Sequence, residues 1–463
     1  MINGKKNPGN PGSMLANPTG QIWLVIVLAA ALLVRASLWL AYPIAPANDT
    51  PTYQHLASSL LNNGGFERYN GTRTPGYPLF LMLAGSEARV YFFQLGLGLL
   101  TTLLVFYIGW QLSQRTWFAG LLALAHTLNL GQIFFEATLL SEALATFLLF
   151  FCLACLVWLF RDHPGSDPLR KNSAILTGLV ALALGLAAAA LAMARPLFAF
   201  VPFWGALFLL LFWRGASFKS RLGAAALVAL PALITLLVWV SFIYTHFNIL
   251  GLDSIGGYHM VNHTTSFFEL APQEYAPIRD TFLKFRAKHI AETGSSINTL
   301  WDAIPALMTQ TKLNYYSLGR VMGDISGRLI REHPWLYLQN LALGWVWFWR
   351  VGVFWLPETI ANSGLRVLAN GLMLVERFSL VGINLLFLGG SLALLSSRIR
   401  NMLKIDLFTW FAASAVWVTS ILQTLAEHGD NARFLAPMQT LVVLVAAAWL
   451  LNFWRSRTWR EKA

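Results

Sequence analysis

Ten apolar runs of 16 to 24 residues occupy nearly half of the 463-residue chain. A helix needs about 20 apolar residues to cross the hydrocarbon core of a bilayer, and a continuous apolar segment can satisfy its backbone there only as a helix. With 56% hydrophobic and 12% charged residues, the chain is not a soluble domain. The sequence therefore predicts an all-α polytopic membrane protein with about ten transmembrane helices. The runs are residues 22–42, 90–112, 116–131, 137–160, 173–194, 196–213, 222–245, 372–395, 405–425 and 434–454.

The distribution of basic residues predicts the orientation of these spans, because cytoplasmic loops are enriched in Lys and Arg. The short loops on the opposite side have only Arg195 and Arg433. We therefore expect a disordered cytoplasmic N-terminus (1–20) and a basic cytoplasmic tail (455–463). The loops that carry the positive charge contain Lys5, Lys6, Arg115, Arg161, Arg170, Lys171, Arg214, Lys219, Arg221, Arg398, Arg400, Lys404, Arg455, Arg457, Arg460 and Lys462.

Two polar segments then face outward. Residues 43–90 form a turn-rich island within a transmembrane core that spans 21–245, and residues 246–333 form a longer outer segment. Residues 334–356 are apolar but rich in Trp, and counting them as a span would place the basic 398–404 loop outside. Because indoles favour the headgroup level, we interpret 334–356 as an interfacial or re-entrant helix that precedes the C-terminal spans of 372–454.

The island contains the first candidate site residue, Asp49. Thr50 is a favourable N-cap and Pro51 suits the first helical position, so a short helix is expected from 51 to about 62. Asp49 would then lie just outside the positive end of that helix, where an ionised carboxylate is favoured. The alternative is that Asp49 is itself the cap and has no further role.

Other ionisable residues map to the same membrane face. Glu142 lies about five residues into a span, where an ionisable group costs roughly 2.5–3.5 kcal/mol on insertion scales, so it is expected to face a polar cavity. Arg73, Arg195 and Arg433 lie at outer positions from which a guanidinium can bind a lipid phosphate. Each arginine alone is an ordinary interfacial residue, and only their convergence points to a site.

The chain has no Walker loop and no strand, glycine-rich turn and helix that would indicate a soluble nucleotide site. A substrate carried in the membrane is therefore expected, with no nucleic-acid partner. His259 and His263 have the spacing of a metal pair, but this signal is weak by itself. No cofactor is expected to be required.

The motifs together are more specific. An acidic residue follows the first span in NDTPTY, and a PGYP corner at 75–78 follows Arg73. LLSEALATFLLF contains Glu142, and HGDNARFLAP contains Arg433. This pattern resembles the GT-C superfamily of integral-membrane glycosyltransferases, most closely the branch of protein O-mannosyltransferases and of bacterial transferases that add aminoarabinose to lipid A. The resemblance covers most of 20–240 and 372–454.

The resemblance implies transfer of a sugar from a polyprenyl-phosphate carrier to a lipid, glycan or protein acceptor, with inversion. The expected location is a bacterial inner membrane with the active site on the periplasmic face. Asp49 matches the family general base, and partial burial is expected to raise its pKa toward the working range. Many relatives have an Asp-Glu pair where this chain has Asn48-Asp49, so a metal requirement is less expected. Glu142 is assigned to positioning the sugar or the acceptor.

The remaining assignments concern substrate binding. Arg73, Arg195 and Arg433 are candidates to hold the carrier phosphate, and Tyr53 and Tyr77 are assigned to the substrate site. Two other functions remain open at this point. One is a lipid-carrier flippase or transporter, and the other is an outer-face glycan polymerase, which would not need Asp49.

Overall fold

The structure, a computed structural model, consists of helices and the loops that connect them in the residues that it describes, and its one β contact there is a single parallel bridge between Ala45 and Thr138. This confirms the all-α polytopic fold class. The described residues are 17–63, 65–66, 69–161, 171–213, 216–352, 355–403, 405–429 and 431–460. The expected disorder of 1–20 falls largely outside these residues, as does the end of the basic tail.

Eight of the described helices are long and apolar enough to cross a membrane, judged by length and composition. The chain is thus an integral, multi-pass membrane protein. These helices are α2 (Pro18–Ala41), α5 (Glu87–Ser113), α8 (Glu142–Arg161), α9 (Lys171–Ala194), α11 (Phe218–Phe247), α17 (Ser363–Ala393), α19 (Leu407–Ala426) and α20 (Asn431–Arg460).

Two expected spans differ from simple helices. The run 116–131 becomes α6 (Thr116–Thr127), followed by α7 (Leu130–Glu136), and the two are bent by 59°. The run 196–213 becomes a 3-10 turn, η1 (Pro196–Phe200), and a short α10 (Val201–Phe212). Proline begins both parts of the second run at a position where its missing N–H is tolerated, so a new helical segment starts there.

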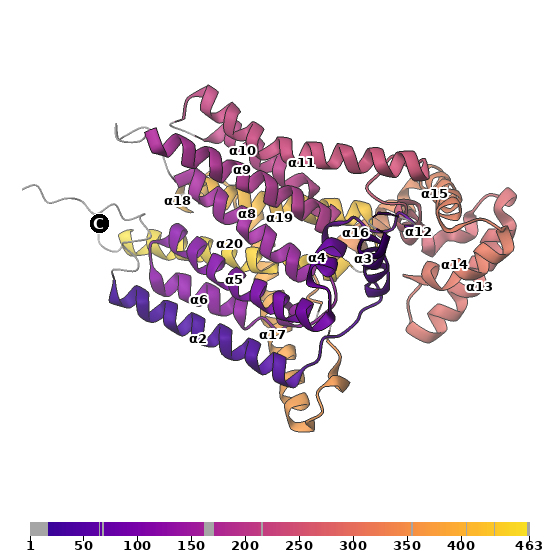
Figure 1. Cartoon of the computed structure of the whole chain (residues 1–463), viewed down its shortest axis with the longest axis horizontal. Helices are drawn as coiled ribbons and strands as arrows, with labels where there is room; N and C mark the ends of the chain where they lie inside the picture. Colours follow the sequence, from indigo (N-terminus) through magenta and orange to yellow (C-terminus); the bar gives the residue numbers. More distant parts are fainter. Residues whose placement is uncertain are drawn as a thin grey trace, which may run out of the picture.

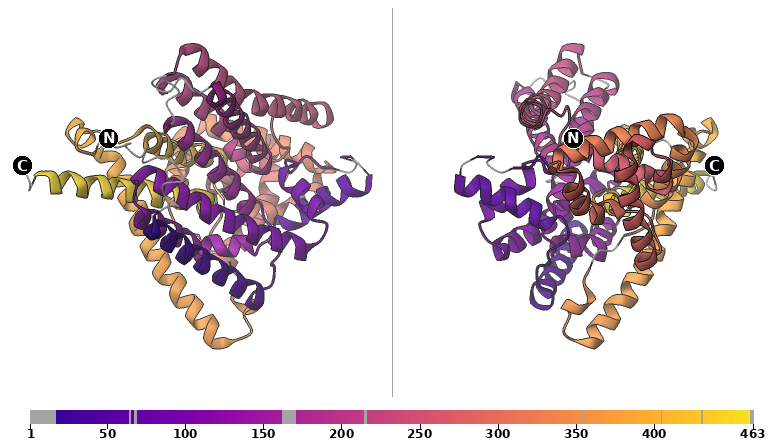
Figure 2. Two further views of the ribbon diagram at one scale, coloured as in Figure 1. Left: turned by 60° about the vertical axis from the view of Figure 1, so that its left-hand side comes forward. Right: turned by 90° about the vertical axis from the view of Figure 1, so that its right-hand side faces the viewer.

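The candidate spans form one bundle, and the two polar segments lie together at one of its ends (Figure 1). The island supplies α3 (Thr50–Asn63) and α4 (Gly76–Ala84), and the outer segment supplies most of the other helices at this end. The C-terminal end of α20 and α18 (Ser397–Leu403) lie at the opposite end. α17 runs obliquely along one side of the bundle and projects beyond it (Figure 2).

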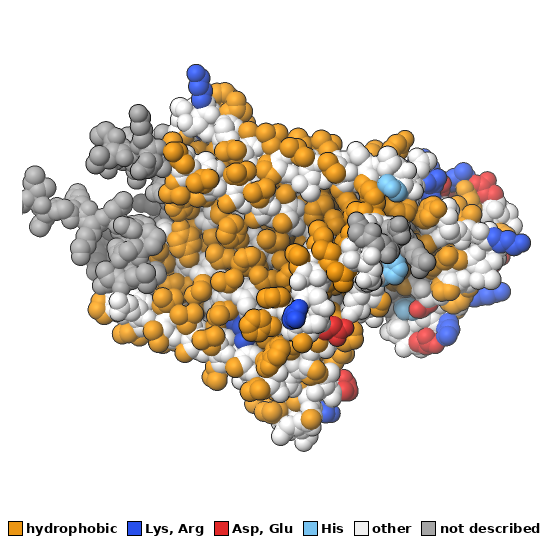
Figure 3. Space-filling model, viewed as in Figure 1, with side chains coloured by type: hydrophobic (Ala, Val, Ile, Leu, Met, Phe, Trp, Pro, Cys, Tyr) orange, Lys and Arg blue, Asp and Glu red, His pale blue; other side chains and the backbone are white. Residues whose placement is uncertain are grey.

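The outer segment is a helical unit with its own hydrophobic core. Phe268, Phe282 and Leu300 are fully buried in this core. Figure 3 shows hydrophobic side chains over the bundle, whereas acidic and basic side chains gather over the end formed by α13 to α15. The elements are α12 (Gly256–Thr264), η2 (Thr265–Leu270), η3 (Gln273–Tyr275), α13 (Ala276–Thr293), α14 (Thr299–Thr311) and α15 (Tyr315–Glu332).

The segment 334–356, expected to be interfacial or re-entrant, contains a 15-residue helix, α16 (Pro334–Phe348). It packs against α19 and α20, and Trp345 stacks on Trp417 of α19. A short turn, η4 (Pro357–Thr359), leads into α17, which begins nine residues before the expected span at 372.

A buried ion pair holds the first span against the bent pair of helices. Arg35 of α2 donates to Glu136 at 2.7 Å and to Thr127 at 2.7 Å, and both members of the ion pair are almost completely buried. A Cβ on Gly98 would lie 2.1 Å from the Glu136 carboxyl carbon, so only glycine allows α5 to approach this closely. Neither residue of the pair lines the cavity described below, so we interpret the pair as structural.

Candidate active site

Asp49 lies at the start of α3, and its backbone and side chain have different roles. The Asp49 carbonyl accepts hydrogen bonds from the N–H groups of Thr52 and Tyr53, which begins the helix. The carboxylate turns the other way and accepts from two arginines. Asp49 therefore occupies the capping position by its backbone, while its carboxylate remains available to the site.

The expectation that Thr50 caps this helix is wrong. Thr50 is the first residue of α3, and its hydroxyl donates to the Leu139 carbonyl at 2.9 Å and accepts from the Ala47 N–H at 2.8 Å. These bonds, with the bridge between Ala45 and Thr138, tie the island to the segment just before Glu142. That attachment fixes Asp49 beside the fourth predicted span.

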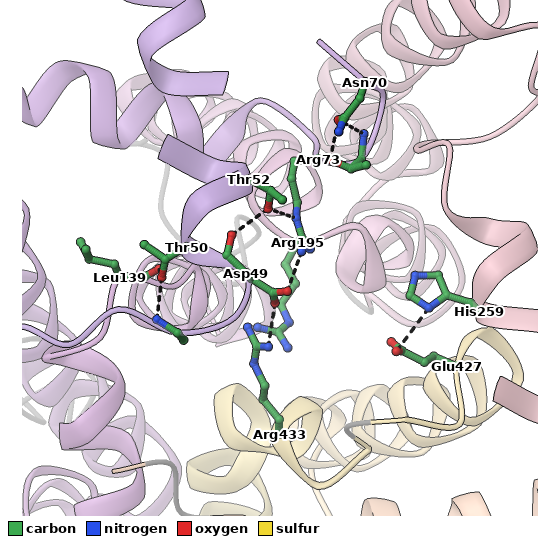
Figure 4. Close-up of polar contacts among 12 residues, drawn as sticks. Asp49, Thr50, Thr52, Asn70, Arg73, Leu139, Arg195, His259, Glu427 and Arg433 are labelled. Atoms are coloured by element: carbon green, nitrogen blue, oxygen red, sulfur yellow. Dashed lines mark hydrogen bonds and ion pairs between the residues drawn. The ribbon is translucent and has the colours of Figure 1, made fainter. Parts of the chain in front are cut away.

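Three arginines from separate parts of the chain lie beside Asp49 (Figure 4), and two of them contact Glu142. Arg73 Nη2 lies 2.6 Å from Asp49 Oδ1, and Arg433 Nη1 lies 2.8 Å from Asp49 Oδ2. Arg433 Nε also donates to Glu142 Oε1, and Arg195 Nη1 lies 2.8 Å from the same oxygen. Arg433 thus bridges the two carboxylates. We call Asp49, Glu142, Arg73, Arg195 and Arg433 the arginine cluster.

Neutral side chains also contact two of the arginines. Arg73 Nε donates to the Thr52 hydroxyl at 2.8 Å, and its guanidinium lies 4.8 Å from the centre of the Tyr53 ring. The Arg195 guanidinium lies 4.7 Å from the centre of the Phe434 ring. These contacts restrict the side chains, so their remaining donors keep a fixed direction.

A cavity of about 1360 Å³ opens beside the cluster, between the bundle end and the outer segment. Asp49, Tyr53, Arg73, Arg195 and Arg433 all line it. The structure thus brings the three predicted phosphate ligands and the predicted base to one cavity, although they come from α3, the loop before α4, the end of α9 and the start of α20.

Glu142 and Tyr77 differ from the expectation. Glu142 is fully buried and lies behind Arg195 and Arg433 rather than in the cavity wall. Tyr77 is also fully buried, and its hydroxyl donates to Gln94 at 2.9 Å while its ring packs edge-on against Tyr53. Tyr77 therefore supports Tyr53 through packing and does not contact the cavity, and Glu142 acts on the cavity through the arginines.

The expected rise in the pKa of Asp49 is also wrong for this arrangement. Burial raises the pKa of the Asp49 carboxyl, but the charges and hydrogen bonds of Arg73 and Arg433 outweigh that effect and lower the pKa to about 2. Asp49 is therefore ionised at neutral pH. A carboxylate with such a low pKa is a weak base as long as both arginines remain bound to it.

A second charged pair lines the same cavity and was not predicted. His259 Nδ1 of α12 lies 3.3 Å from Glu427 Oε1, in the connection between α19 and α20. Figure 4 shows this pair across the site from the arginine cluster. The sequence feature that could have indicated Glu427 as a site residue was the motif around Arg433, because EHGDNARFLAP begins with Glu427. His259 was considered only with His263, and its contact with Glu427 requires the tertiary structure.

The His259–Glu427 pair predicts a pH dependence of stability. Burial lowers the pKa of His259, but the Glu427 carboxylate outweighs this effect and raises the pKa from 6.5 to about 8. A raised histidine pKa stabilises the fold below pH 6.5, and this contribution disappears as the pH rises through 8. The shift corresponds to about 2 kcal/mol.

We therefore expect the Tm of the wild type to fall between pH 6.5 and 8.5 by more than the Tm of His259→Gln. Thermal unfolding in one detergent at several pH values measures this difference. His246→Gln is the control, because His246 is exposed and bonds only within its own helix. Parallel pH profiles for the wild type and His259→Gln would contradict the assignment.

Within the described part of the chain, no group of three or more His, Cys, Asp or Glu is arranged to hold a metal ion. His259 pairs with Glu427, and the His263 ring lies 5.7 Å from the His428 ring. The weak sequence signal from His259 and His263 is therefore not accompanied by a third ligand among these residues.

Comparison with known proteins identifies the fold. No protein-family model and no curated protein matches the sequence. Among solved structures, the archaeal oligosaccharyltransferase AglB from Archaeoglobus fulgidus, in complex with an inhibitory peptide and a dolichol-phosphate, matches with a TM-score of 0.50 and 13% identity. The alignment covers 93% of this chain and 50% of AglB, so the chain spans about half the length of that enzyme.

Two further solved structures are similar at lower scores. The A. fulgidus oligosaccharyltransferase tethered to an acceptor peptide matches with a TM-score of 0.48 and 13% identity, over 92% of this chain and 49% of that one. ArnT from Cupriavidus metallidurans, bound to undecaprenyl phosphate, matches with a TM-score of 0.32 and 13% identity, over 95% and 79%. From the AglB alignment and the helical architecture, we conclude that the chain shares the fold of the half of AglB that it aligns with, in agreement with the fold that the resemblance to the GT-C superfamily predicts.

Proposed function

We propose that this protein transfers a sugar from a polyprenyl-phosphate donor to an acceptor hydroxyl at the outer, periplasmic face of a bacterial inner membrane, with inversion at the anomeric carbon. The observation that carries the proposal is the convergence of Arg73, Arg195 and Arg433 on the two carboxylates of Asp49 and Glu142 beside one large cavity. In the AglB structure a protein of this fold is bound to dolichol-phosphate.

The charge of the arginine cluster supports a monophosphate-linked donor. Three guanidinium charges face the two carboxylates of Asp49 and Glu142, which leaves one positive charge in excess. A sugar joined to a lipid through one phosphate is a phosphodiester with one negative charge, so the bound cluster would be neutral. A diphosphate carries more charge than the cluster can balance.

In the proposed reaction, the acceptor oxygen attacks the anomeric carbon from the side opposite the phosphate. The bond from the anomeric carbon to the phosphate oxygen breaks, and its electron pair stays on the phosphate, where the arginines stabilise the charge that develops. The acceptor proton passes to Asp49. Arg73 and Arg433 would contact both the donor phosphate and Asp49. A bound phosphate would therefore weaken their electrostatic stabilisation of the Asp49 carboxylate and raise the pKa of Asp49. Asp49 would therefore become an effective base only with a donor in place.

The test is the binding of undecaprenyl phosphate, compared with undecaprenol and undecaprenyl diphosphate, to the purified protein in detergent. We expect undecaprenyl phosphate to bind most tightly. Arg433→Gln and Arg73→Gln should each weaken it about tenfold to a hundredfold, because a charge-assisted hydrogen bond is lost. The lysine variants should recover only part of the affinity, since an ammonium lacks the fork of a guanidinium.

Arg279→Gln is the matched control, because Arg279 pairs with Asp280 on α13 and does not line the cavity. Equal affinity of Arg433→Gln, Arg73→Gln and the wild type for undecaprenyl phosphate would refute the phosphate site. Mass spectrometry of cell-envelope glycans with and without the protein would then identify the sugar and its acceptor.

A further inference from the structure

The cavity has a second polar wall, built by the outer segment opposite the arginine cluster. We call it the α12 wall and define it by His259 and Asn262 of α12, Trp301 of α14, and Glu427 and His428 of the α19–α20 connection. We propose that the α12 wall is a carbohydrate-binding subsite in which Asn262 binds a sugar hydroxyl. This proposal rests on the proposed function and deepens it, since it assigns the polyhydroxylated part of a substrate to named residues.

The main observation is the state of Asn262. Its side chain is 1% exposed, yet neither its Nδ2 nor its Oδ1 has a hydrogen-bond partner among the described residues. A buried amide without partners is destabilising, so native structures rarely retain one without a function. Asn262 is among the residues that line the cavity, so its unpartnered amide lies next to the space that a ligand would occupy.

The chemistry of this amide selects the ligand. Nδ2 donates hydrogen bonds and Oδ1 accepts them, and a sugar hydroxyl can do both. An anion would use only the donor, and an ammonium group only the acceptor. The charges of His259 and Glu427 balance each other, so the wall as a whole attracts neither type of ion. A neutral ligand with several hydroxyls fits this combination best.

The surroundings of Asn262 are crowded with further polar atoms. A Cβ on Gly429 would lie 2.7 Å from Asn298 Oδ1, 3.1 Å from Glu427 Oε1 and 3.4 Å from Asn262 Nδ2. A side chain at residue 429 would therefore displace the Asn298 amide and press on the other polar groups. Trp301 is 37% exposed and adds an apolar surface to the same wall. A few fixed polar groups beside an aromatic ring are typical of small-molecule sites.

The two walls of the cavity would bind different parts of the substrate. The arginine cluster, with its excess positive charge, takes the phosphate, and the neutral α12 wall takes hydroxyls. The sugar bound here can come from the donor or from a glycan acceptor, and both have the same chemistry. The experiment separates these sources.

Asn262→Leu is the informative variant, because it removes both polar atoms at similar volume. The Asn262 amide makes no hydrogen bond in the free protein, so replacing it with an apolar side chain removes no stabilising contact. The Tm of Asn262→Leu should therefore equal or exceed that of the wild type. The affinity for a sugar-bearing ligand should fall about tenfold or more. Asn384→Leu is the matched control: Asn384 is equally buried, but it donates to the Trp349 carbonyl at 3.0 Å and accepts from Gln439 at 2.9 Å. This control should lose stability and retain binding.

Binding would be measured with undecaprenyl phosphate, with undecaprenyl phosphate carrying glucose, mannose or arabinose, and with the methyl glycosides of these sugars. If the subsite holds the donor sugar, Asn262→Leu loses the extra affinity that a sugar confers on undecaprenyl phosphate. If it holds the acceptor, Asn262→Leu loses affinity for a methyl glycoside alone. Either loss, with the Tm maintained, supports the subsite.

Three results would overturn it: a lowered Tm for Asn262→Leu, affinities equal to those of the wild type for all probes, or no sugar-dependent affinity in the wild type. In each case, retained binding of sugar-free undecaprenyl phosphate would leave the proposed function intact. Failure of the wild type to bind undecaprenyl phosphate would instead contradict the proposed function itself.

Discussion

Asp49→Asn is expected to reduce transfer about 10²–10⁴-fold while leaving the fold and the binding of lipid phosphate intact. An asparagine amide cannot accept the acceptor proton, so the chemical step loses its base. The fold should tolerate the change because α3 begins at the Asp49 carbonyl and the side chain is 27% exposed. The change also removes one negative charge beside Arg73 and Arg433, so affinity for undecaprenyl phosphate should be equal or higher.

The measurement is single-turnover transfer from the donor sugar identified in the cell envelope, together with binding of undecaprenyl phosphate. Asp302→Asn is a matched control, because Asp302 also lines the cavity but pairs with His289 in the outer segment, 2.7 Å away. It should retain the wild-type rate. Transfer by Asp49→Asn at the wild-type rate would exclude Asp49 as the base and would favour a glycan polymerase, whereas a wild type that binds the lipid carrier without any transfer would favour a lipid-carrier transporter.

In contrast to Asp49→Asn, Glu142→Gln is expected to lose much of its stability and to retain residual transfer activity. Glu142 is fully buried and shares one oxygen between Arg195 and Arg433, so its replacement leaves the buried Arg195 without its carboxylate partner and Arg433 with Asp49 alone. Breaking a buried ion pair in this way costs about 3–5 kcal/mol. Transfer should be slower but measurable, because Asp49 remains and Glu142 only positions the arginines.

Thermal unfolding and the transfer rate per folded molecule distinguish these two effects. Glu136→Gln is the control, because Glu136 is equally buried and pairs with Arg35 away from the cavity. It should lower the Tm to a similar extent and leave the KM for the donor unchanged, whereas Glu142→Gln should raise that KM. A Glu142→Gln variant with a normal Tm and no activity would instead indicate a direct catalytic role.

The site illustrates where local sequence reasoning succeeds. Asp49, Arg73, Arg195 and Arg433 were assigned to one membrane face because the apolar runs and the basic loops determine on which side of the membrane each residue lies. Residues on one side share a thin layer, so convergence was a reasonable prediction. The choice of partners was not predictable, because Arg433 bridges Asp49 and Glu142 across almost the whole length of the chain.

The incorrect expectations share one physical cause. Burial alone would raise the pKa of Asp49, but two guanidinium groups reverse the shift. Depth alone would place Glu142 in a polar cavity, but Arg195 and Arg433 lie between Glu142 and that cavity. Tyr77 lies within the island in sequence, yet it packs into the protein against Gln94. In each case the neighbours that decide the outcome come from distant segments.

The sequence alone determined the all-α class and the approximate limits of most spans, because a bilayer requires an apolar run of fixed length and a backbone that satisfies its own hydrogen bonds. The predicted number of about ten spans exceeds the eight candidate spans among the described residues, or nine if the bent pair α6 and α7 counts as one. The sequence also supplied the residues of the arginine cluster. Only the tertiary structure decided that His259 faces Glu427, that the Asn262 amide has no hydrogen-bond partner among the described residues, and that Arg35 meets Glu136. Those contacts depend on how the outer segment docks on the bundle and how helices pack side by side. Residues that pair across a long sequence separation produce no periodic pattern in the sequence from which the pairing could be predicted.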